Sequence, residues 1–514
     1  MLTATSYILP DEQDCAIFEA IVPDDHYLRR VKEVIDFERC REELAACYSA
    51  HFGRPAMEPL LLLKLEFLAF HYGLSDRQLM KQAQVNMAFR YFLDLSLRSS
   101  LPHHTLMTKF RERLGVAKHQ QVFDDIVAQA RERGLVKDRL RLKDATHVLA
   151  NIAIPSTVRL VAEIRTRLLA AVRPYAAERV AAEEAQAASI HVTTADSSGE
   201  ERLLQRVTHL RSLLLWVETL VMALGPALAE DRQRQVLAEA LALAHKVLAD
   251  REPKAEDKLI SVHDTDARWG KHGKPYAGYL LDVAADADSA IITAVNVLPA
   301  NGNEAADAPA LIRHEEETHG NDVEGLSMDG IGFRGSVLRE CTDPEGLNLE
   351  MFVPPTPEPP TPCFRVELFV LNATGETLTC PAGQTTTKRE HRAGQGWIFR
   401  FPRSTCMDCP LQKQCMEELP KTTGRTVFKT MYEEEYRAAR AKAQTPEFAA
   451  VRRQHWRIER KLGEIVHWHG GRRARYRGHW RVLLQSLMTA VVVNVKRIVA
   501  MVAQPLRAEL AISQ

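Results

Sequence analysis

Apolar and polar residues alternate along residues 139–155, and this pattern predicts a β-strand, because successive side chains on a strand point to opposite faces. Asp144 shares the apolar face of this predicted strand with Leu140, Leu142, Val148, Ile152 and Ile154. A buried carboxylate must be paired, hydrogen-bonded or bound to a metal ion. Asp144 is therefore either a hydrogen-bonded structural residue or a ligand of a cation.

The spacing of apolar residues predicts helices over residues 1–135, 157–250 and 432–504. In the first region, Gly73 can end one helix and Ser75 can cap the next, which gives a helix–turn–helix outline. This outline is compatible with DNA binding and equally with simple helix packing. The second region predicts an inserted helical hairpin or small bundle.

The middle of the chain predicts more strands. Tyr279–Ala284 and Ile291–Leu298 flank turn-like residues and predict a hairpin, and a helix over Ala305–Glu316 leads to a strand that ends at Asp329. Three strands, a helix and a further strand, with carboxylates on the first and last strands, follow a ribonuclease H-like order. We expect an α/β protein with a ribonuclease H-like mixed-sheet core, a helical N-terminal domain, a helical insertion and a small Cys-rich insertion.

Three carboxylates have the settings that a shared cation site needs. Asp144 lies in a predicted strand, Asp329 ends one, and Glu459 lies in the basic, helix-like stretch His455–Glu464. Mg²⁺ prefers oxygen ligands, and a pair of ions can activate a water or a 3′ hydroxyl and stabilise the leaving oxygen of a phosphodiester. The pattern predicts two Mg²⁺ ions, with Mn²⁺ as an alternative, and an enzyme that cuts and joins DNA.

The overall composition does not indicate a class of partner, whereas the charge of one local stretch does. The 514 residues predict two to four domains, and Lys+Arg and Asp+Glu both number 67, so the overall charge does not indicate a partner. Between Arg452 and Arg481, ten basic residues face two acidic ones, which is typical of a phosphate-binding surface or of a solvated helix face. We expect no signal peptide at the N-terminus, and no membrane span, because charged and polar residues interrupt the longest apolar stretches.

Four of the nine cysteines are grouped in the way that a metal site requires: Cys380, Cys406, Cys409 and Cys415. Four thiolates form the closed ligand set of a structural Zn²⁺ ion. Free cysteines and an iron–sulfur cluster remain alternatives. The clustering indicates a reducing cytoplasm rather than a disulfide framework, and the other five cysteines are expected in the core or in incidental positions.

Taken in order, these segments resemble the DDE transposases of bacterial insertion sequences, and most closely the insertion-sequence family numbered 1182. The segments that carry the resemblance are Asp144–His147, Asp264–Trp269, Ser327–Gly330, Trp456–Glu459 and Arg472–Gly478. The segment Cys380–Gly383 and the run Cys406–Cys415 resemble the cysteine-bearing insertion of the same family. The resemblance covers nearly the whole chain.

The resemblance implies roles for individual residues. Asp144, Asp329 and Glu459 would be catalytic. The rival carboxylates are Asp264, Asp266, Asp286 and Glu464. Of these, Asp264 and Asp266 lie in a segment that the family does not use to bind metal. Related transposases carry a Tyr, Arg, Glu, Lys signature around the last carboxylate, and here the other three slots hold Arg452, His455 and Val466. We expect DNA contacts from Arg452, His455, Arg472, Arg473, Arg475, Tyr476 and Arg477.

The expected organisation has four parts. Residues 1–135 would form a DNA-binding domain, and residues 136–344 would form the first part of the catalytic core, interrupted by the insertion at 157–250. Residues 345–430 would form the Cys-rich insertion, after the proline-rich linker Val353–Pro362, and residues 431–514 would complete the core with the catalytic Glu.

The predicted function is transposition: the protein would bind the ends of its element, cleave the DNA and join the 3′ ends to target DNA. We expect it to act in the bacterial cytoplasm, associated with the nucleoid, and to form a homodimer in the synaptic complex. The alternatives are a domesticated ribonuclease H-like nuclease and a catalytically decayed DNA-binding protein.

Overall fold

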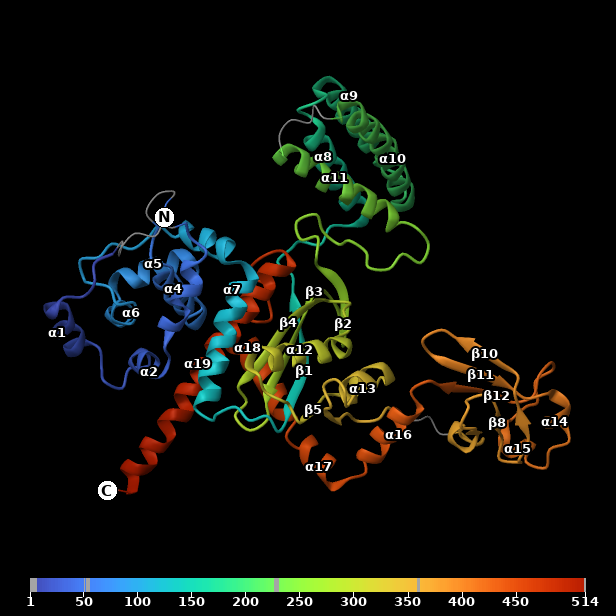
Figure 1. Ribbon diagram of the computed structural model, residues 1–514. Helices are drawn as coiled ribbons and strands as arrows, with labels where there is room; N and C mark the ends of the chain where they lie inside the picture. The colour runs from blue at the N-terminus through green and yellow to red at the C-terminus, as the bar shows by residue number, and fades with distance from the viewer. Residues whose placement is uncertain (1–6, 50, 52–55, 226–230, 358–360, 513–514) are drawn as a thin grey trace.

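A curled, mixed sheet of six strands lies at the centre of the computed structural model, which describes residues 7–49, 51, 56–225, 231–357 and 361–512 (Figure 1). The strand order is β2-β3-β1-β5-β6, and β4 also pairs with β3. β1 is antiparallel to β3 and parallel to β5, which is itself parallel to β6. The bounds are β1 Arg141–Leu149, β2 Arg268–His272, β3 Lys274–Asp286, β4 Ile292–Pro299, β5 Gly325–Ser327 and β6 Glu350–Phe352.

β1 ends earlier than the sequence pattern predicts. The strand stops at Leu149, which pairs with Gly278, and Ile154 is 51% exposed instead of continuing the buried face. A segment from the other end of the chain continues the pairing here: Leu149 donates its N–H to Arg472 O at 2.9 Å, and Ala474 N donates to Leu149 O at 2.9 Å. The alternation of residues 151–155 therefore does not extend the strand.

Helices cover both faces of the sheet. α7 (Thr105–Glu132) and α19 (His479–Ile512) pack on one face, and α12 (Glu304–His319) and α13 (Gly335–Thr342) pack on the other. The strand residues alternate accordingly, since Leu142 and Val148 of β1 belong to the core under α7 and α19. α18 (Trp456–Trp468) lies against β1 and brings the C-terminal part of the chain to the first strand.

The N-terminal helices form the predicted helix–turn–helix outline. α4 (Pro59–His71) ends before Gly73, which has φ +66°, and the Ser75 side chain accepts from Gln78 N to cap α5 (Asp76–Val85). Every residue of α4 except His71 is buried, so this helix serves the core. The other N-terminal helices are α1 Glu12–Ile21, α2 Tyr27–Val34, α3 Arg41–Ala45 and α6 Met87–Phe92.

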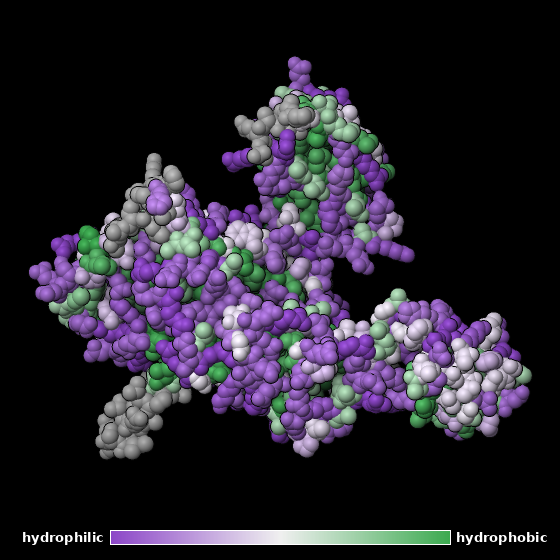
Figure 2. Space-filling view, in the orientation of Figure 1, coloured by the Kyte–Doolittle hydropathy of each residue, from purple (hydrophilic) through white to green (hydrophobic). Residues whose placement is uncertain are grey.

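Two further units project from the central body as separate lobes (Figure 2). The first is the predicted helical insertion, which has its own hydrophobic core and consists of α8 Thr157–Val172, α9 Ala177–Thr193, α10 Gly199–Leu224 and α11 Asp231–Ala249. The second contains the cysteines and two three-stranded sheets. Its elements are β7 Val370–Leu371, β8 Leu378–Thr379, β9 Thr385–Thr386, β10 Arg389–Arg392, β11 Gly396–Arg400, α14 Arg403–Met407, α15 Gln412–Cys415 and β12 Thr426–Thr430.

The start of the Cys-rich unit differs from the predicted boundary at residue 345. β6 (Glu350–Phe352) pairs with β5 and is part of the central sheet, so the unit begins only after it. The proline-rich linker follows directly, and its residues 358–360 lie outside the described part of the chain. After the unit, α16 (Glu433–Lys442) and α17 (Pro446–Arg452) lead back to α18.

Two helices are long and apolar enough to cross a membrane by length and composition, Gly199–Leu224 and His479–Ala503. The most apolar window is 33% buried in the first helix and 67% buried in the second. One or two such helices are weak evidence of a membrane span.

Candidate active site

Asp144 is the centre of the carboxylate group that the sequence predicted. Its side chain is half-buried on β1, and Oδ1 accepts a hydrogen bond from Ala145 N at 2.8 Å. Burial, together with the negative charges of Asp329 and Glu459, raises the pKa of Asp144 to about 6. The electrostatic contact means that the structure brings together all three carboxylates, which are more than 300 residues apart at the extremes.

The two other carboxylates reach Asp144 from different elements. Asp329 follows β5. Because β5 runs parallel to β1 and pairs with its first residues, Asp329 lies at the same level of the sheet as Asp144. Asp329 Oδ1 accepts from Ile331 N at 3.1 Å and so begins a short 3₁₀ turn. Glu459 lies in the first turn of α18, and both it and Asp329 are exposed. The site is open to solvent and can admit a large substrate.

Arg452 and His455 join α17 and α18 to the strand that leads to Asp329. The Arg452 guanidinium donates to Met328 O at 2.6 Å and to Ser327 Oγ at 3.4 Å, and His455 Nδ1 lies 3.2 Å from Ser327 Oγ. Burial, with a contribution from Arg452, lowers the pKa of His455 to about 4. His455 is therefore neutral at pH 7 and only 3% exposed, so a direct contact with DNA would require the ring to move.

Arg452 also adds positive charge to the site. Burial lowers its pKa, and Asp329, Glu459 and Asp144 oppose that change. An Arg side chain remains charged in proteins, so a cation faces the three carboxylates from α17. This arrangement leaves room for an anionic substrate beside the acidic residues.

The segment 472–477 lies along the end of β1, as its hydrogen bonds to Leu149 require. Arg472 donates to His147 O at 2.7 Å and to Thr146 Oγ1 at 3.2 Å. Arg473 and Arg477 are exposed, and Arg477 Nε donates to Asn151 O at 2.9 Å. Of the basic residues expected to contact DNA in this segment, these two present the most solvent-accessible side chains.

Arg475 and Tyr476 of the same segment instead face the N-terminal helices. The Arg475 guanidinium lies 4.7 Å from the centre of the Phe70 ring, and Arg111 lies 5.5 Å from that of Tyr476. Both side chains are half-buried. Their present contacts hold the N-terminal helices to the core.

Glu304 is a fourth carboxylate near the group, which the sequence analysis missed. It begins α12, and burial raises its pKa, with further contributions from Asp329 and Asp144. Its carbonyl oxygen accepts from Lys143 Nζ at 2.8 Å. No local pattern marks Glu304, because its approach to Asp144 depends on the crossing of α12 over the sheet.

The rival carboxylates near the second strand have structural partners. Asp264 is buried and accepts from the Tyr279 hydroxyl, and Asp266 Oδ2 accepts from His479 N at 2.9 Å, where α19 begins. The segment Asp264–Trp269 is thus hydrogen-bonded to the start of α19 and stabilises it. These contacts explain its acidic residues without a role in catalysis.

Asp286 and Glu464 are also engaged elsewhere. Asp286 Oδ1 accepts from Ser289 N at 2.6 Å inside the turn after β3, and Glu464 pairs with Lys461 at 2.9 Å on α18. Asp329 and Glu459 help to raise the pKa of Asp144, and Asp329 and Asp144 help to raise that of Glu304. The electrostatic group therefore consists of the three predicted residues and Glu304.

Two segments of the chain match known families. Residues 16–113 match a transposase domain family (DUF772), and residues 379–499 match the transposase DDE domain family. Together these matches indicate an insertion-sequence transposase. The second match contains Glu459 and the four clustered cysteines. No curated protein and no solved structure matches the chain.

The three carboxylates lie within electrostatic reach of one another but do not form a preformed metal cage. Within the described residues, no group of three or more His, Cys, Asp or Glu side chains is arranged to hold a metal ion. DDE transposase domains generally depend on divalent metal ions, and the donor set of Asp144, Asp329 and Glu459 consists of the oxygen ligands that such ions prefer. Burial, and to a smaller extent repulsion by Asp329 and Glu459, raises the pKa of Asp144, and a bound cation would relieve that repulsion.

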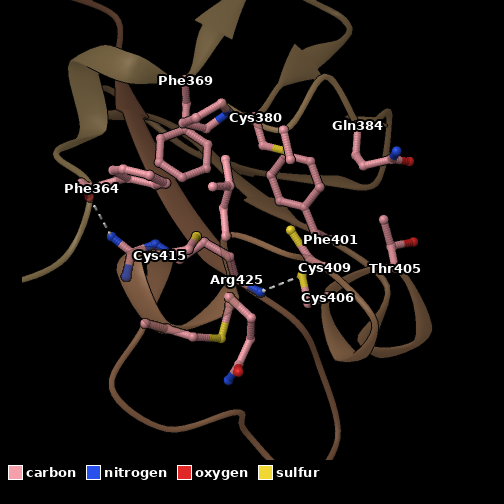
Figure 3. Close-up of a pocket in the computed structure, with 15 residues that line it drawn as sticks. Phe364, Phe369, Cys380, Gln384, Phe401, Thr405, Cys406, Cys409, Cys415 and Arg425 are labelled. Carbon is pink, nitrogen blue, oxygen red and sulfur yellow. Dashed lines mark hydrogen bonds between the residues drawn. The ribbon is translucent and has the colours of Figure 1, made fainter.

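The four clustered cysteines line one small pocket in the Cys-rich unit (Figure 3). Cys406 lies on α14, Cys415 ends α15, and Cys380 and Cys409 lie in turns. Burial raises the pKa of Cys415, and the other three thiols add to the increase, so all four lie within electrostatic reach. The four cysteines were predicted to share one site and they line one pocket, whereas a bound metal stays a prediction.

The walls of the pocket are fixed by close packing. Phe369 and Phe401 are buried beside the thiols, and Arg425 N donates to Cys406 Sγ at 3.4 Å. A Cβ atom at Gly424 would lie 2.5 Å from Cys406 Sγ, so only glycine fits at this approach. The unit therefore gathers its sulfur atoms around a small apolar core.

Proposed function

We propose that this protein is a DDE transposase of the insertion-sequence family numbered 1182, which binds the ends of its element, cleaves DNA and joins the 3′ ends to target DNA. The observation that carries this proposal is the convergence of Asp144, Asp329 and Glu459 from β1, β5 and α18. The order of β4, β3, β1, β5 and β6, with β5 and β6 parallel to β1, supports a ribonuclease H-like core.

In this proposal Asp144, Asp329 and Glu459 hold two Mg²⁺ ions, or Mn²⁺ in their place. When bound, such ions lower the pKa of an attacking water or 3′ hydroxyl and stabilise the leaving oxygen. The side chains position the reactants, and they form no covalent bond with DNA. Phosphoryl transfer depends mainly on such positioning and on charge neutralisation.

Basic residues around the carboxylates would hold the DNA backbone. Arg452 lies beside the site, and exposed Arg473 and Arg477 follow the end of β1. A guanidinium group can donate two parallel hydrogen bonds to the oxygens of one phosphate. We also assign DNA contacts to His455, Arg472, Arg475 and Tyr476. Because each of these four side chains is buried or half-buried, it would reach DNA only after a local rearrangement.

Cleavage and joining of a labelled duplex that carries the flanking ends of the gene, in the presence of Mg²⁺, tests the proposal. We expect activity in the wild type, none in Asp329→Asn or Glu459→Gln, and retained DNA binding in both. Glu464→Gln is the matched control on the same helix and should remain active, because Glu464 pairs with Lys461.

Other outcomes would select an alternative function. Binding without cleavage by the wild type would favour a decayed DNA-binding protein, and cleavage without joining would favour a domesticated nuclease. Cleavage by Asp329→Asn would show that a different carboxylate, with Glu304 as the nearest candidate, completes the site.

Synapsis of two ends requires two active sites, so we propose a homodimer on end DNA in the bacterial nucleoid. A mass measurement of the complex with end duplexes tests this, and a single protein chain per complex would contradict it. We further propose a structural Zn²⁺ ion at Cys380, Cys406, Cys409 and Cys415, with an iron–sulfur cluster as the alternative.

A further inference from the structure

A basic groove lies on the side of α18 that faces away from the catalytic carboxylates. It has a volume of about 450 Å³ and is lined mainly by α18 and α19. Its cationic side chains are Arg457, Arg460, Lys461, Lys496 and Arg497, against the acids Asp288 and Glu464. None of these residues belongs to the carboxylate site or to the segment 472–477.

The acidic residues of the groove are already neutralised. Asp288 pairs with Arg139 at 3.0 Å, outside the groove, and Glu464 pairs with Lys461 at 2.9 Å and lies 3.8 Å from Lys496. The groove therefore retains an excess of positive charge after its internal ion pairs are formed.

The arginines supply that excess charge. In the described part of the chain, Arg457, Arg460 and Arg497 form no ion pair with a carboxylate. Arg457 donates to Ala287 O, and Arg497 Nε donates to Ser289 O at 2.6 Å, so carbonyl groups of one turn orient both guanidinium groups. Unpaired arginines held in place by backbone oxygens are suited to bind an external anion.

The geometry of α18 links this groove to the reaction. Trp456, Arg457, Arg460, Lys461 and Glu464 share one face of the helix, and Glu459 lies about 130° away around the axis at 3.6 residues per turn. Because an α-helix with its side chains is only about 10–12 Å wide, the groove lies within the length of a few base pairs of the carboxylates.

We propose that this groove, built on Arg457, Arg460 and Arg497, is a second binding site for the phosphate backbone of the DNA duplex whose scissile phosphate lies at the carboxylates. The proposal rests on the proposed function. Trp456, which is 51% exposed, gives the rim an aromatic surface for the sugars. A protein partner would require a larger apolar centre, whereas the apolar lining here is limited to Trp456, Ala290 and Ala500.

The salt dependence of DNA binding tests the groove. Each phosphate contact contributes about 0.9 to the slope of log K against log salt concentration. The double variant Arg460→Gln/Arg497→Gln should lower the magnitude of that slope by about 1.8. Relative to the wild type, its binding should therefore be weakened roughly 60-fold more at 0.1 M salt than at 1 M salt. Binding is measured by anisotropy of a labelled end duplex without divalent ions.

A control removes the same charge elsewhere. Arg211→Gln/Arg437→Gln changes two exposed arginines, on α10 and α16, that lie outside the groove. Its slope should remain within about 0.3 of the wild-type slope. Equal losses in the two double variants would overturn the proposal, because they would reflect overall charge, and so would an unchanged slope in the groove variant.

A second variant guards against misfolding. Arg460→Gln alone changes an exposed side chain whose structural contact is with the neighbouring Trp456 ring at 6.0 Å, so it should fold normally and lower the slope by about 0.9. Cleavage of end DNA by the wild type is measured in parallel. Wild-type cleavage with unchanged slopes would reject the groove alone, whereas a wild type that neither binds nor cleaves end DNA would reject both proposals.

Discussion

The Arg452 guanidinium donates a 2.6 Å hydrogen bond to the carbonyl oxygen of Met328, the residue immediately before Asp329. The same group lies in the electrostatic field of Asp144, Asp329 and Glu459. Arg452 therefore fixes the position of the strand end that carries Asp329 and also places a cation beside the carboxylates. These two roles can be separated by a substitution that keeps the charge.

We predict that Arg452→Lys lowers the rate of DNA cleavage at least tenfold and changes DNA affinity less than threefold. Lys keeps the charge but lacks the rigid guanidinium group, whose Nη1 donates to both Met328 O and Ser327 Oγ. Single-turnover cleavage and anisotropy measure the two quantities. Arg453→Lys, at an exposed neighbour, is the control; a loss of affinity equal to the loss of rate would contradict the positioning role.

Protonation of His455 should destabilise the protein in weak acid. Its pKa is about 4 in the folded state and 6.5 in the unfolded state, so the unfolded state binds the proton first as the pH falls. The stability that neutral His455 contributes is complete above pH 6.5 and is lost as the pH falls toward 4. At pH 5 the loss is about 2 kcal/mol, from 1.36 kcal/mol per pKa unit.

His455→Gln removes this titration, so urea unfolding should show a smaller stability loss between pH 7 and pH 5 than in the wild type, by about 2 kcal/mol. His71 and His469, whose pKa values burial also lowers to about 4, continue to titrate in the variant. His263→Gln is the control, because His263 is exposed. Parallel pH profiles for wild type and His455→Gln would refute the prediction.

Asp144→Asn should stabilise the metal-free protein while it abolishes cleavage. The folded pKa of Asp144, about 6, is above the unfolded value of 3.8, so the folded state binds more protons between these pH values. The wild type therefore loses stability as the pH rises from about 4 to 6. The substitution should recover up to about 3 kcal/mol at pH 7 and almost nothing at pH 4.

Unfolding of the two proteins in urea, with and without Mg²⁺, measures this effect. Mg²⁺ should stabilise the wild type, because a ligand that binds only the folded state shifts the equilibrium toward it, and should have little effect on Asp144→Asn. A variant less stable than the wild type at pH 7 would mean that Asp144 serves mainly as a hydrogen-bonded structural residue.

The sequence predicted the features that depend on neighbouring residues. Alternation identified β1 around Asp144, and the Gly73 and Ser75 signals identified the ends of α4 and α5. These signals work because a strand face or a helix cap is decided within a few residues. The convergence of Asp144 with Asp329 and Glu459 was predicted from their settings on a strand, at a strand end and on a helix, together with the resemblance to a family.

Features decided by long-range packing were beyond the sequence. Lys143 is buried against Asp282, 2.7 Å away, and donates to Glu304 O, and no local pattern announces either contact. β1 ends at Leu149, opposite Gly278, although the alternation of apolar residues continues beyond it. The sequence equally offered no means to tell that Arg475 faces the N-terminal helices rather than solvent.

The Cys-rich unit should depend on a metal ion for its folding. Its two small sheets enclose few buried apolar residues, which are gathered around the thiol pocket, and metal-binding free energy adds directly to folding free energy in such units. We predict about one Zn²⁺ per chain in the purified protein, measured by elemental analysis. Chelation should make residues 361–431 sensitive to protease and leave the central sheet resistant.

Cys409→Ser should lose the zinc and show the same protease sensitivity without chelator, because a tetrahedral site with three thiolates binds Zn²⁺ more weakly. Cys363→Ser is the matched control, since Cys363 lies in the same unit but does not line the pocket. Iron with acid-labile sulfide in place of zinc would assign a cluster to the same four thiols. A metal-free protein whose Cys-rich unit resists protease would instead show that the packing around Phe369 and Phe401 is sufficient to hold the unit together.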